Sequence, residues 1–249
     1  MADYDAFAAC YDALMQDADY DARAVVCRDL LARYGVRDGI LLDFACGTGS
    51  MAVRMARMGF DVIGVDASES MLCAAQQKAA EQGVRILFLC QTMQELDLYG
   101  TVRGTICTLD SLNHLTRKAD FERAIRRVAL FTEPGGMFVF DVNIVYKHRH
   151  VLADHTFVIE TDDVYCVWQN AYGRQGTVQI MLDLFQKDGN VYIRASEQFA
   201  ERAYEAEWIV STLGKYGFTV CEILDADTMK TPGQRTERLL FAAKKEGQE

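Results

Sequence analysis

The sequence is poor in proline and short of positive charge. Of its 249 residues only 2 are proline, and 26 Lys and Arg stand against 36 Asp and Glu, a formal net charge of -10. Binding to a nucleic-acid backbone usually needs clustered basic side chains, so this balance disfavours a nucleic acid as partner. No apolar run approaches the roughly 20 residues of a membrane-spanning helix, and the acidic start lacks a signal peptide's features. We therefore expect a cytoplasmic protein with no membrane partner.

The eight cysteines lack any CxxC pair, which excludes a zinc knuckle or a thioredoxin motif. Most lie inside apolar segments, so we expect small buried side chains in a reducing compartment and no metal site. Half of the residues are hydrophobic and a quarter are charged, as in globular proteins. The length suits one large domain, or one domain with an insertion.

Strand and helix patterns alternate between residues 39 and 142. Short continuous apolar runs, typical of strands buried on both faces, occur at residues 40–42, 62–65, 84–90, 102–109 and 137–140. Helical spacing of apolar residues occurs at residues 20–34, 50–58, 68–82 and 119–131. This alternation predicts an α/β fold with a doubly wound, Rossmann-like parallel sheet.

After residue 143 the pattern changes to strands without helices between them. Four strand-like stretches occur at residues 155–160, 164–171, 178–185 and 191–199. They predict an antiparallel β insertion after the fifth strand, with a hairpin turn at Asp188-Gly189. A helix at 206–216 and strands at 218–224 and 237–243 then complete a seven-stranded sheet.

A glycine-rich turn, residues 46–49, follows the strand that ends at Asp43. Glycine lets a backbone approach a ligand closely, and the next helix offers free N–H groups to an anion. Asp66, which ends the second strand, is placed to accept hydrogen bonds from a ribose diol. The glycine-rich turn and Asp66 together predict an adenosine-type ligand. Residues 47–52 also fit the GxGxxA pattern of dinucleotide sites. Asp43, however, suits the ammonium group of S-adenosylmethionine better than a pyrophosphate.

Four motifs, in order along the chain, resemble those of the class I S-adenosylmethionine-dependent methyltransferases. They are residues 43–49 (DFACGTG), 65–72 (VDASESML), 91–96 (QTMQEL) and 133–138 (EPGGMF). The first is a DxACGTG variant, in which Ala45 replaces the family's first glycine. The resemblance covers residues 39–142, and the last helix and two strands match as well. It implies S-adenosylmethionine as cofactor and methyl transfer as the reaction.

The resemblance also implies a role for each matching residue. Asp43 and the turn would hold the methionine moiety, Asp66 the ribose hydroxyls, and the others the adenine or the methionine end. Thr92 stands where the family usually has an aspartate that accepts from the adenine amino group. The expected cofactor-binding residues are Asp43, Ala45, Cys46, Gly47, Thr48, Gly49, Asp66, Ala67, Met71, Gln91, Thr92, Met93, Leu109, Asp110 and Ser111.

His114 and Tyr11 are the candidate catalytic residues. The Ser-x-x-His-Leu spacing around His114 is similar to that of small-molecule N-methyltransferases of the glycine N-methyltransferase type, where it would serve as a general base. Its alternative role is to cap or pack the next helix. Tyr11 lies in a segment that resembles a lid over the cofactor, and it would donate to the methionine carboxylate or the substrate. Its alternative role is to pack its ring on the sheet.

From the resemblance we expect four parts. They are an N-terminal helical lid (1–38), a cofactor-binding core (39–145), a β-rich substrate cover (146–203) and a C-terminal helix with two strands (204–249). The basic stretch 147–150 is expected to be a solvated connector, with anion binding at the site's mouth as its alternative. Arg202 and Tyr204 resemble the segment that re-enters the core near the active site.

The expected function is methyl transfer to a small-molecule acceptor. Residues 109–112 contain no proline, unlike the Asn/Asp-Pro-Pro-Tyr motif of enzymes that methylate amino groups of adenine, cytosine or glutamine. Three alternatives stay open at this point: a tRNA or rRNA base methyltransferase, a nicotinamide-dependent oxidoreductase, and a non-catalytic cofactor-binding module. The sequence leaves open the acceptor atom and whether the insertion pairs between subunits of a homodimer.

Overall fold

The fold is built on a seven-stranded sheet. The computed structural model describes residues 5–247, and within residues 5–9 only the side chain of Ala8 is described. In spatial order the strands are β10 (Phe218–Asp225), β11 (Arg238–Lys245), β5 (Thr132–Asn143), β4 (Val102–Cys107), β1 (Ile40–Phe44), β2 (Asp61–Asp66) and β3 (Leu87–Cys90). Strands β1 to β5 run parallel, whereas β11 is antiparallel to both its neighbours. The predicted α/β, Rossmann-like sheet is confirmed.

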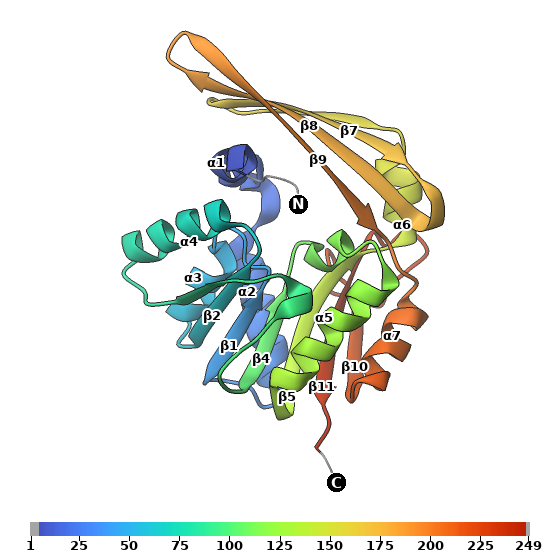
Figure 1. The fold of residues 1–249 in the computed structure, drawn as a ribbon. Helices are drawn as coiled ribbons and strands as arrows, with labels where there is room; N and C mark the ends of the chain where they lie inside the picture. Colours follow the sequence, from blue (N-terminus) through green and yellow to red (C-terminus); the bar gives the residue numbers. More distant parts are fainter. Residues whose placement is uncertain (1–4, 248–249) are drawn as a thin grey trace.

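Helices cover both faces of this sheet (Figure 1). The first face packs against α2 (Tyr20–Arg33), α3 (Ser50–Arg57) and α4 (Glu69–Glu81). The second packs against α5 (Lys118–Phe131) and α7 (Ala206–Lys215). Alternate residues of one strand serve opposite faces, since Leu41 belongs to the first core and Leu42 to the second.

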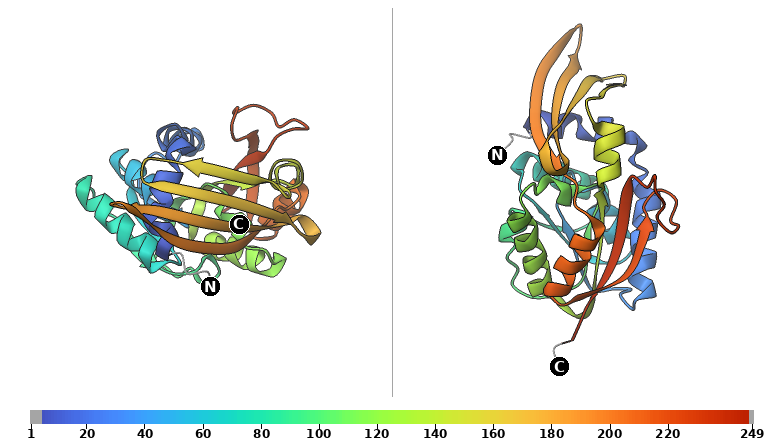
Figure 2. Two further views of the ribbon diagram at one scale, coloured as in Figure 1. Left: turned by 90° about the horizontal axis from the view of Figure 1, so that it is seen from above. Right: turned by 90° about the vertical axis from the view of Figure 1, so that its right-hand side faces the viewer.

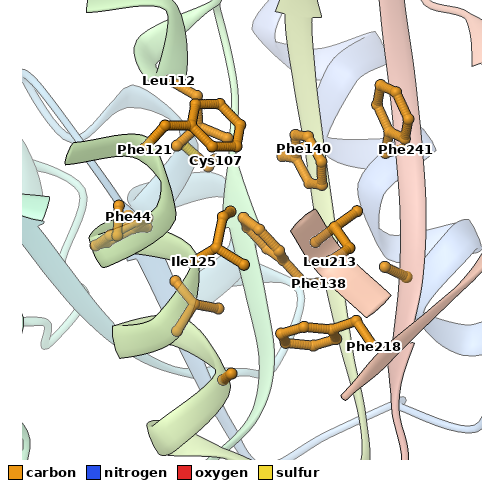
Figure 3. Close-up of a cluster of buried hydrophobic side chains, with 14 of the residues drawn as sticks. Phe44, Cys107, Leu112, Phe121, Ile125, Phe138, Phe140, Leu213, Phe218 and Phe241 are labelled. Atoms are coloured by element: carbon orange, nitrogen blue, oxygen red, sulfur yellow. The ribbon is translucent and has the colours of Figure 1, made fainter. Parts of the chain in front are cut away.

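Phenylalanine rings fill the second face of the sheet (Figure 3). Phe138 stacks on Phe140 with 4.5 Å between ring centroids, and Phe140 stacks on Phe241 at 5.0 Å. All three side chains are fully buried. Burying one such ring contributes roughly 1.5–3 kcal/mol. The sheet is therefore a rigid base for the loops at its carboxyl edge.

A second, four-stranded antiparallel sheet lies above that carboxyl edge (Figures 1 and 2). Its strands are β6 (Thr156–Glu160), β7 (Val164–Tyr172), β8 (Thr177–Asp188) and β9 (Val191–Arg202). We call this sheet the cover. It forms a small apolar core of its own, against which Leu14 of helix α1 (Asp5–Leu14) packs. The predicted antiparallel insertion after the fifth strand is confirmed.

Two local expectations were wrong. Strand β3 begins at Leu87 rather than at residue 84, because the Val84 N–H instead bonds the Ala79 carbonyl at the end of α4. The basic stretch 147–150 is not simply a solvated connector. It joins α6 (Val145–Lys147) to a π-helical turn, His148–Leu152, in which His148 is fully buried. Its Nδ1 lies 2.9 Å from the Gly176 carbonyl oxygen, which fixes the ring beneath the cover.

Cysteine burial is also less uniform than expected. Cys73 and Cys90 are exposed and Cys221 is half-buried, while the other five are buried. No helix within residues 5–247 has the length and apolar character needed to cross a membrane.

Candidate functional site

Asp43 lies at the end of β1, at the centre of the carboxyl edge. Its side chain is buried, and burial together with the neighbouring Asp66 raises the pKa of its carboxyl from 3.8 to about 7. The backbone N–H of Ala52, in α3, donates to it. Its Oδ2 has no hydrogen-bond partner within the described residues. Since buried polar atoms are nearly always satisfied, this oxygen suits a donor supplied by a ligand.

The glycine-rich turn is bound to the end of β2. The Cys46 N–H donates to the Val65 carbonyl at 2.9 Å, and the Gly47 N–H donates to Asp66 Oδ2 at 2.9 Å. A Cβ on Gly49 would lie 2.9 Å from the Cβ of Ala75, so only glycine lets α3 and α4 approach this closely. A Cβ on Gly47 would meet no atom within 4 Å, so this part of the turn faces open space.

Ala45 adopts a left-handed conformation, with φ of 68°. A non-glycine residue pays a steric cost there, commonly of about 1–2 kcal/mol. Strain of this kind collects at functional sites. Ala45 stands where the resembling family has glycine. The fold holds Ala45 in this left-handed conformation, so the turn keeps its shape.

Asp66 connects the turn to helix α4. Its Oδ1 accepts from the Ser68 N–H at 3.0 Å, and Ser68 in turn caps α4 through Met71. Burial raises the pKa of Asp66, although these backbone donors partly offset the rise. Each carboxylate oxygen keeps a second lone pair for a ligand hydroxyl. Of the residues expected at the adenine, Ala67 is exposed at this edge and Met71 is buried.

The loop after β3 holds the remaining adenine candidates. The Gln91 N–H donates to the Asp66 carbonyl, and the Gln91 side chain bonds both backbone groups of Asp97, at 2.8 and 3.2 Å. Gln91 thus braces the loop. Thr92 donates its hydroxyl to Glu95 at 2.9 Å and can still accept, while Met93 packs against the core.

The turn after β4 has a strained backbone, and hydrogen bonds to a carboxylate hold it in place. Leu109 and Asp110 both have positive φ, of 58° and 55°, and their N–H groups donate to Asp141 at 3.0 and 2.7 Å. The Asp110 carboxylate pairs with Arg238 at 3.1 Å and accepts from Asn143. Burial tends to raise the pKa of Asp110, but Arg238 and other cations outweigh it, so the pKa is lowered.

The third residue of this turn, Ser111, donates its hydroxyl to the Thr108 carbonyl at 2.9 Å. Its side chain therefore tightens the turn. Leu109, Asp110 and Ser111 all lie at the same edge as Asp43 and Asp66, as the sequence predicted, but their polar groups bind mainly within the protein.

Helix α1 is attached to the cofactor turn by a charged cluster. Asp12 pairs with Lys78 of α4 at 2.7 Å and accepts from the Thr48 hydroxyl at 2.7 Å. Lys78 also donates to Thr48 and to Ser50, at 3.0 and 2.6 Å. Helix α1 and the turn are therefore joined through Thr48, one of the predicted cofactor residues.

Tyr11 lies on the same helix, close to the strained turn. Its hydroxyl is hydrogen-bonded to Tyr20. Burial, Tyr20 and the charge of Asp110 together raise its pKa well above the ordinary value. Tyr11 is therefore a neutral hydrogen-bonding group at neutral pH, near the edge that carries Asp110.

His114 ends the short 3₁₀ helix Ser111–His114 and faces the cover. Its ring lies 5.1 Å from that of Phe199, and its Nε2 is 3.8 Å from Glu201 Oε1. Its position near both carboxyls helps to lower the pKa of Asp66 and of Asp110. The side chain is 33% exposed, so it stays accessible. It does not cap α5, whose N-cap residue is Arg117.

Glu201 lies between two imidazoles. Its Oε1 faces His114, and its Oε2 is 3.6 Å from Nε2 of His148. Glu201 and His148 are both buried, and neither of these two facing atoms has a hydrogen bond within the described residues. The carboxylate thus links a fixed, buried histidine to an accessible one.

Sequence reasoning missed Glu201, Arg238 and Lys78, and it considered His148 only as part of the basic stretch 147–150. One signal was present for Glu201. Alternation along β9 places Glu197, Phe199 and Glu201 on one face, opposite the apolar residues of β8, such as Ile180. A carboxylate on an inward apolar face is a candidate for function. Nothing local marks Arg238 or Lys78.

The edge fits a ligand that carries both an amino-acid group and an adenosine. Asp43 offers an unpartnered buried oxygen for an ammonium group, Asp66 offers lone pairs for a ribose, and Gly47 leaves room for close approach. Over the part of the chain that the structure describes, no group of three His, Cys, Asp or Glu side chains is arranged to hold a metal ion.

Comparison with known proteins agrees with this geometry. Residues 41–136 match the family model for a methyltransferase domain. A protein of Geobacillus sp. (strain WCH70), provisionally named a methyltransferase, is 36% identical over 97% of this chain and 99% of its own length. The crystal structure of an S-adenosylmethionine-dependent methyltransferase from Clostridium acetobutylicum ATCC 824 is 29% identical. It superposes with a TM-score of 0.90 over 98% of this chain and 99% of that one.

A more distant structure shares the fold alone. It is the sugar N-methyltransferase KedS8 from Streptoalloteichus sp ATCC 53650, 22% identical, with a TM-score of 0.77 over 94% of this chain and 90% of that chain.

Proposed function

The chain belongs to the class I S-adenosylmethionine-dependent methyltransferases, and on that premise we propose that it methylates a small molecule bound beneath the cover. The alternatives of a nicotinamide-dependent oxidoreductase and of a non-catalytic module are set aside by family membership. A small acceptor is supported by the cover lying over the carboxyl edge (Figure 1), by the net charge of -10, and by the fold shared with the sugar N-methyltransferase KedS8.

The cofactor residues are proposed from the geometry above. Asp43 would bind the ammonium group, the turn 45–49 the rest of the methionine moiety, and Asp66 the ribose. S-adenosylmethionine supplies a methyl group already activated on a sulfonium. The protein therefore mainly aligns the nucleophile and excludes water, and alignment alone can contribute roughly 7–11 kcal/mol.

The observation that carries the mechanism is the contact between His114 and Glu201. Glu201 would hold a proton on Nε2 of His114 and so leave Nδ1 free to accept a proton from the acceptor. His148, fixed by Gly176, would keep the Glu201 carboxylate in place from behind. We assign His114 as general base and Glu201 as its positioning residue. Tyr11 would donate to the methionine carboxylate or to the acceptor.

We propose a role for each of the four parts expected from the sequence. Residues 1–38 would act as lid, 39–145 as cofactor-binding core, 146–203 as substrate cover, and 204–249 as the closing part of the sheet.

A transfer assay tests this function. Purified protein and methyl-labelled S-adenosylmethionine are incubated separately with a low-molecular-mass metabolite fraction and with tRNA. We expect label only in small molecules. His114→Ala should lower the transfer rate by about 10²–10⁴-fold, the usual contribution of a general base, and leave affinity for S-adenosylhomocysteine within about twofold. The matched control is His155→Ala, which removes an exposed histidine.

Either of two results would contradict the proposal. Label in tRNA would support the RNA alternative. Full activity of His114→Ala would return that residue to a packing role against Phe199.

A further inference from the structure

A second cavity lies at the junction of the cover and the core, away from the cofactor turn. Its volume is about 410 Å³. Its walls come from the start of α5, the π-helical turn, the ends of β7 and β9, and α7. They include Lys118, Arg149, Tyr172, Gly176, Arg202 and Trp208. Apart from Gly176, whose carbonyl fixes His148, none of the residues assigned above to the cofactor or to proton transfer lines it.

Three cations line this cavity outside the ion pairs of the described residues. Lys118, Arg149 and Arg202 form no ion pair with any residue among those the structure describes. One acidic residue, Glu205, is found in the lining, and it is exposed. In a chain with 36 acidic and 26 basic side chains, unpaired cations should rarely gather by chance. Like charges held together repel one another unless an anion joins them.

Neutral groups hold two of these cations in place. Arg202 donates from Nη1 to the Thr116 carbonyl at 3.1 Å, and its guanidinium lies 5.0 Å from the centre of the Tyr204 ring. The Lys118 ammonium lies 4.9 Å from the centre of the Trp208 ring. Carbonyls and rings orient a cation without cancelling its charge. The Nε of Arg202 is, in addition, a buried donor with no acceptor in the described structure.

We propose that this cavity binds the phosphate group of a small phosphorylated molecule. A phosphate monoester carries about -1.5 to -2 charges at pH 7 and three acceptor oxygens, which matches three cations better than a single carboxylate does. Guanidinium groups suit such oxyanions because their N–H donors form a planar fork. The site is distinct from the cofactor and proton-transfer residues, and the inference does not depend on the methyl acceptor proposed above.

The two tryptophans of the chain provide the measurement. Inorganic phosphate is titrated into ¹⁵N-labelled protein at constant ionic strength, and the two indole N–H signals are followed by NMR. Trp208 lines the cavity, whereas Trp168 donates its indole N–H to Asn170 in the cover and serves as internal reference. Trp168→Phe assigns the signals. We expect a saturable shift of the Trp208 signal alone.

Charge variants make the test specific. Arg149→Gln removes a cavity cation and should weaken phosphate binding at least tenfold. Lys187→Gln removes one charge from the far end of the cover and should change affinity less than twofold. Affinity for S-adenosylhomocysteine should stay unchanged in both variants.

Three results would overturn the inference. They are no saturable shift of Trp208 up to about 20 mM phosphate, well above a 1 mM Kd; equal affinity for acetate; or undiminished binding by Arg149→Gln. Failure to bind S-adenosylhomocysteine would instead count against the proposed reaction and leave the phosphate result standing.

Discussion

At the scale of single residues, the protonation of Asp43 should couple to cofactor binding. Its pKa of about 7 means that roughly half of the carboxyl groups carry a proton at pH 7 before ligand binds. An ammonium group beside it favours the ionised form and lowers the pKa. We predict that binding of S-adenosylhomocysteine at pH 7 releases protons, and that affinity rises as pH rises from about 5 to 8.

Calorimetry in buffers of different ionisation enthalpy measures this proton release. Asp43→Asn should abolish it, whereas Asp61→Asn, at an exposed position, should leave it intact. Release that is unchanged by Asp43→Asn would show that another group titrates.

The raised pKa of Asp43 also affects the stability of the fold. Because the folded pKa lies above the ordinary value of 3.8, ionisation of Asp43 lowers the free energy of unfolding as pH rises through about 4–7.

Residues whose partners lie nearby in sequence could be predicted, and those with distant partners could not. Asp43, Asp66 and the turn between them form a local βαβ unit, so their meeting follows from strand order alone. Glu201 reaches His114 across 87 residues of chain, through a sheet whose docking no local pattern specifies. Arg238 likewise meets Asp110 only because β11 lies beside β5.

At the scale of elements, the attachment of α1 should control how often the lid opens. The Asp12–Lys78 pair is partly exposed, with side-chain exposures of 50% and 22%, so its contribution is at most about 1 kcal/mol. We predict that Lys78→Met raises hydrogen exchange of the α1 amides by up to about fivefold and speeds dissociation of S-adenosylhomocysteine.

Exchange mass spectrometry and stopped-flow binding measure these two effects. The matched control is Lys244→Met on β11, which removes an exposed lysine far from the lid. Unchanged exchange in α1 would show that the apolar contacts of Leu14 and the buried Ala8 hold the helix without the ion pair.

Element types were easier to predict than element ends. Strand β1 was predicted from its continuous apolar run, and helix α5 from the helical spacing of its apolar residues. The start of β3 depends instead on where α4 ends, since Gly83 turns the chain and Val84 bonds back to Ala79. The π-helical turn 148–152 is set by the buried contact of His148 with Gly176, which lies outside any local window.

At the scale of the whole molecule, the seven-stranded sheet has a much larger apolar core than the cover. The seven-stranded sheet is buried on both faces, beneath helices on each side. Among the described residues, the cover contributes five buried side chains from β7 and β8 to its cluster, and its outer strand positions, such as Tyr192 and Val158, are exposed. Local stability follows buried apolar contact. The cover should therefore open more readily than the sheet below it.

We predict that amides of β6 to β9 exchange through local opening, at least tenfold faster than those of β1, β4 and β5. Because a tenfold ratio corresponds to about 1.4 kcal/mol, this is a modest difference in opening free energy. Mass spectrometry on peptides of matched length measures it. Equal protection of both sheets would show that they open as one unit, and an acceptor could then enter only past the lid. Faster exchange in the cover would mean that it can admit an acceptor while the cofactor edge, anchored in the sheet beneath, keeps its geometry.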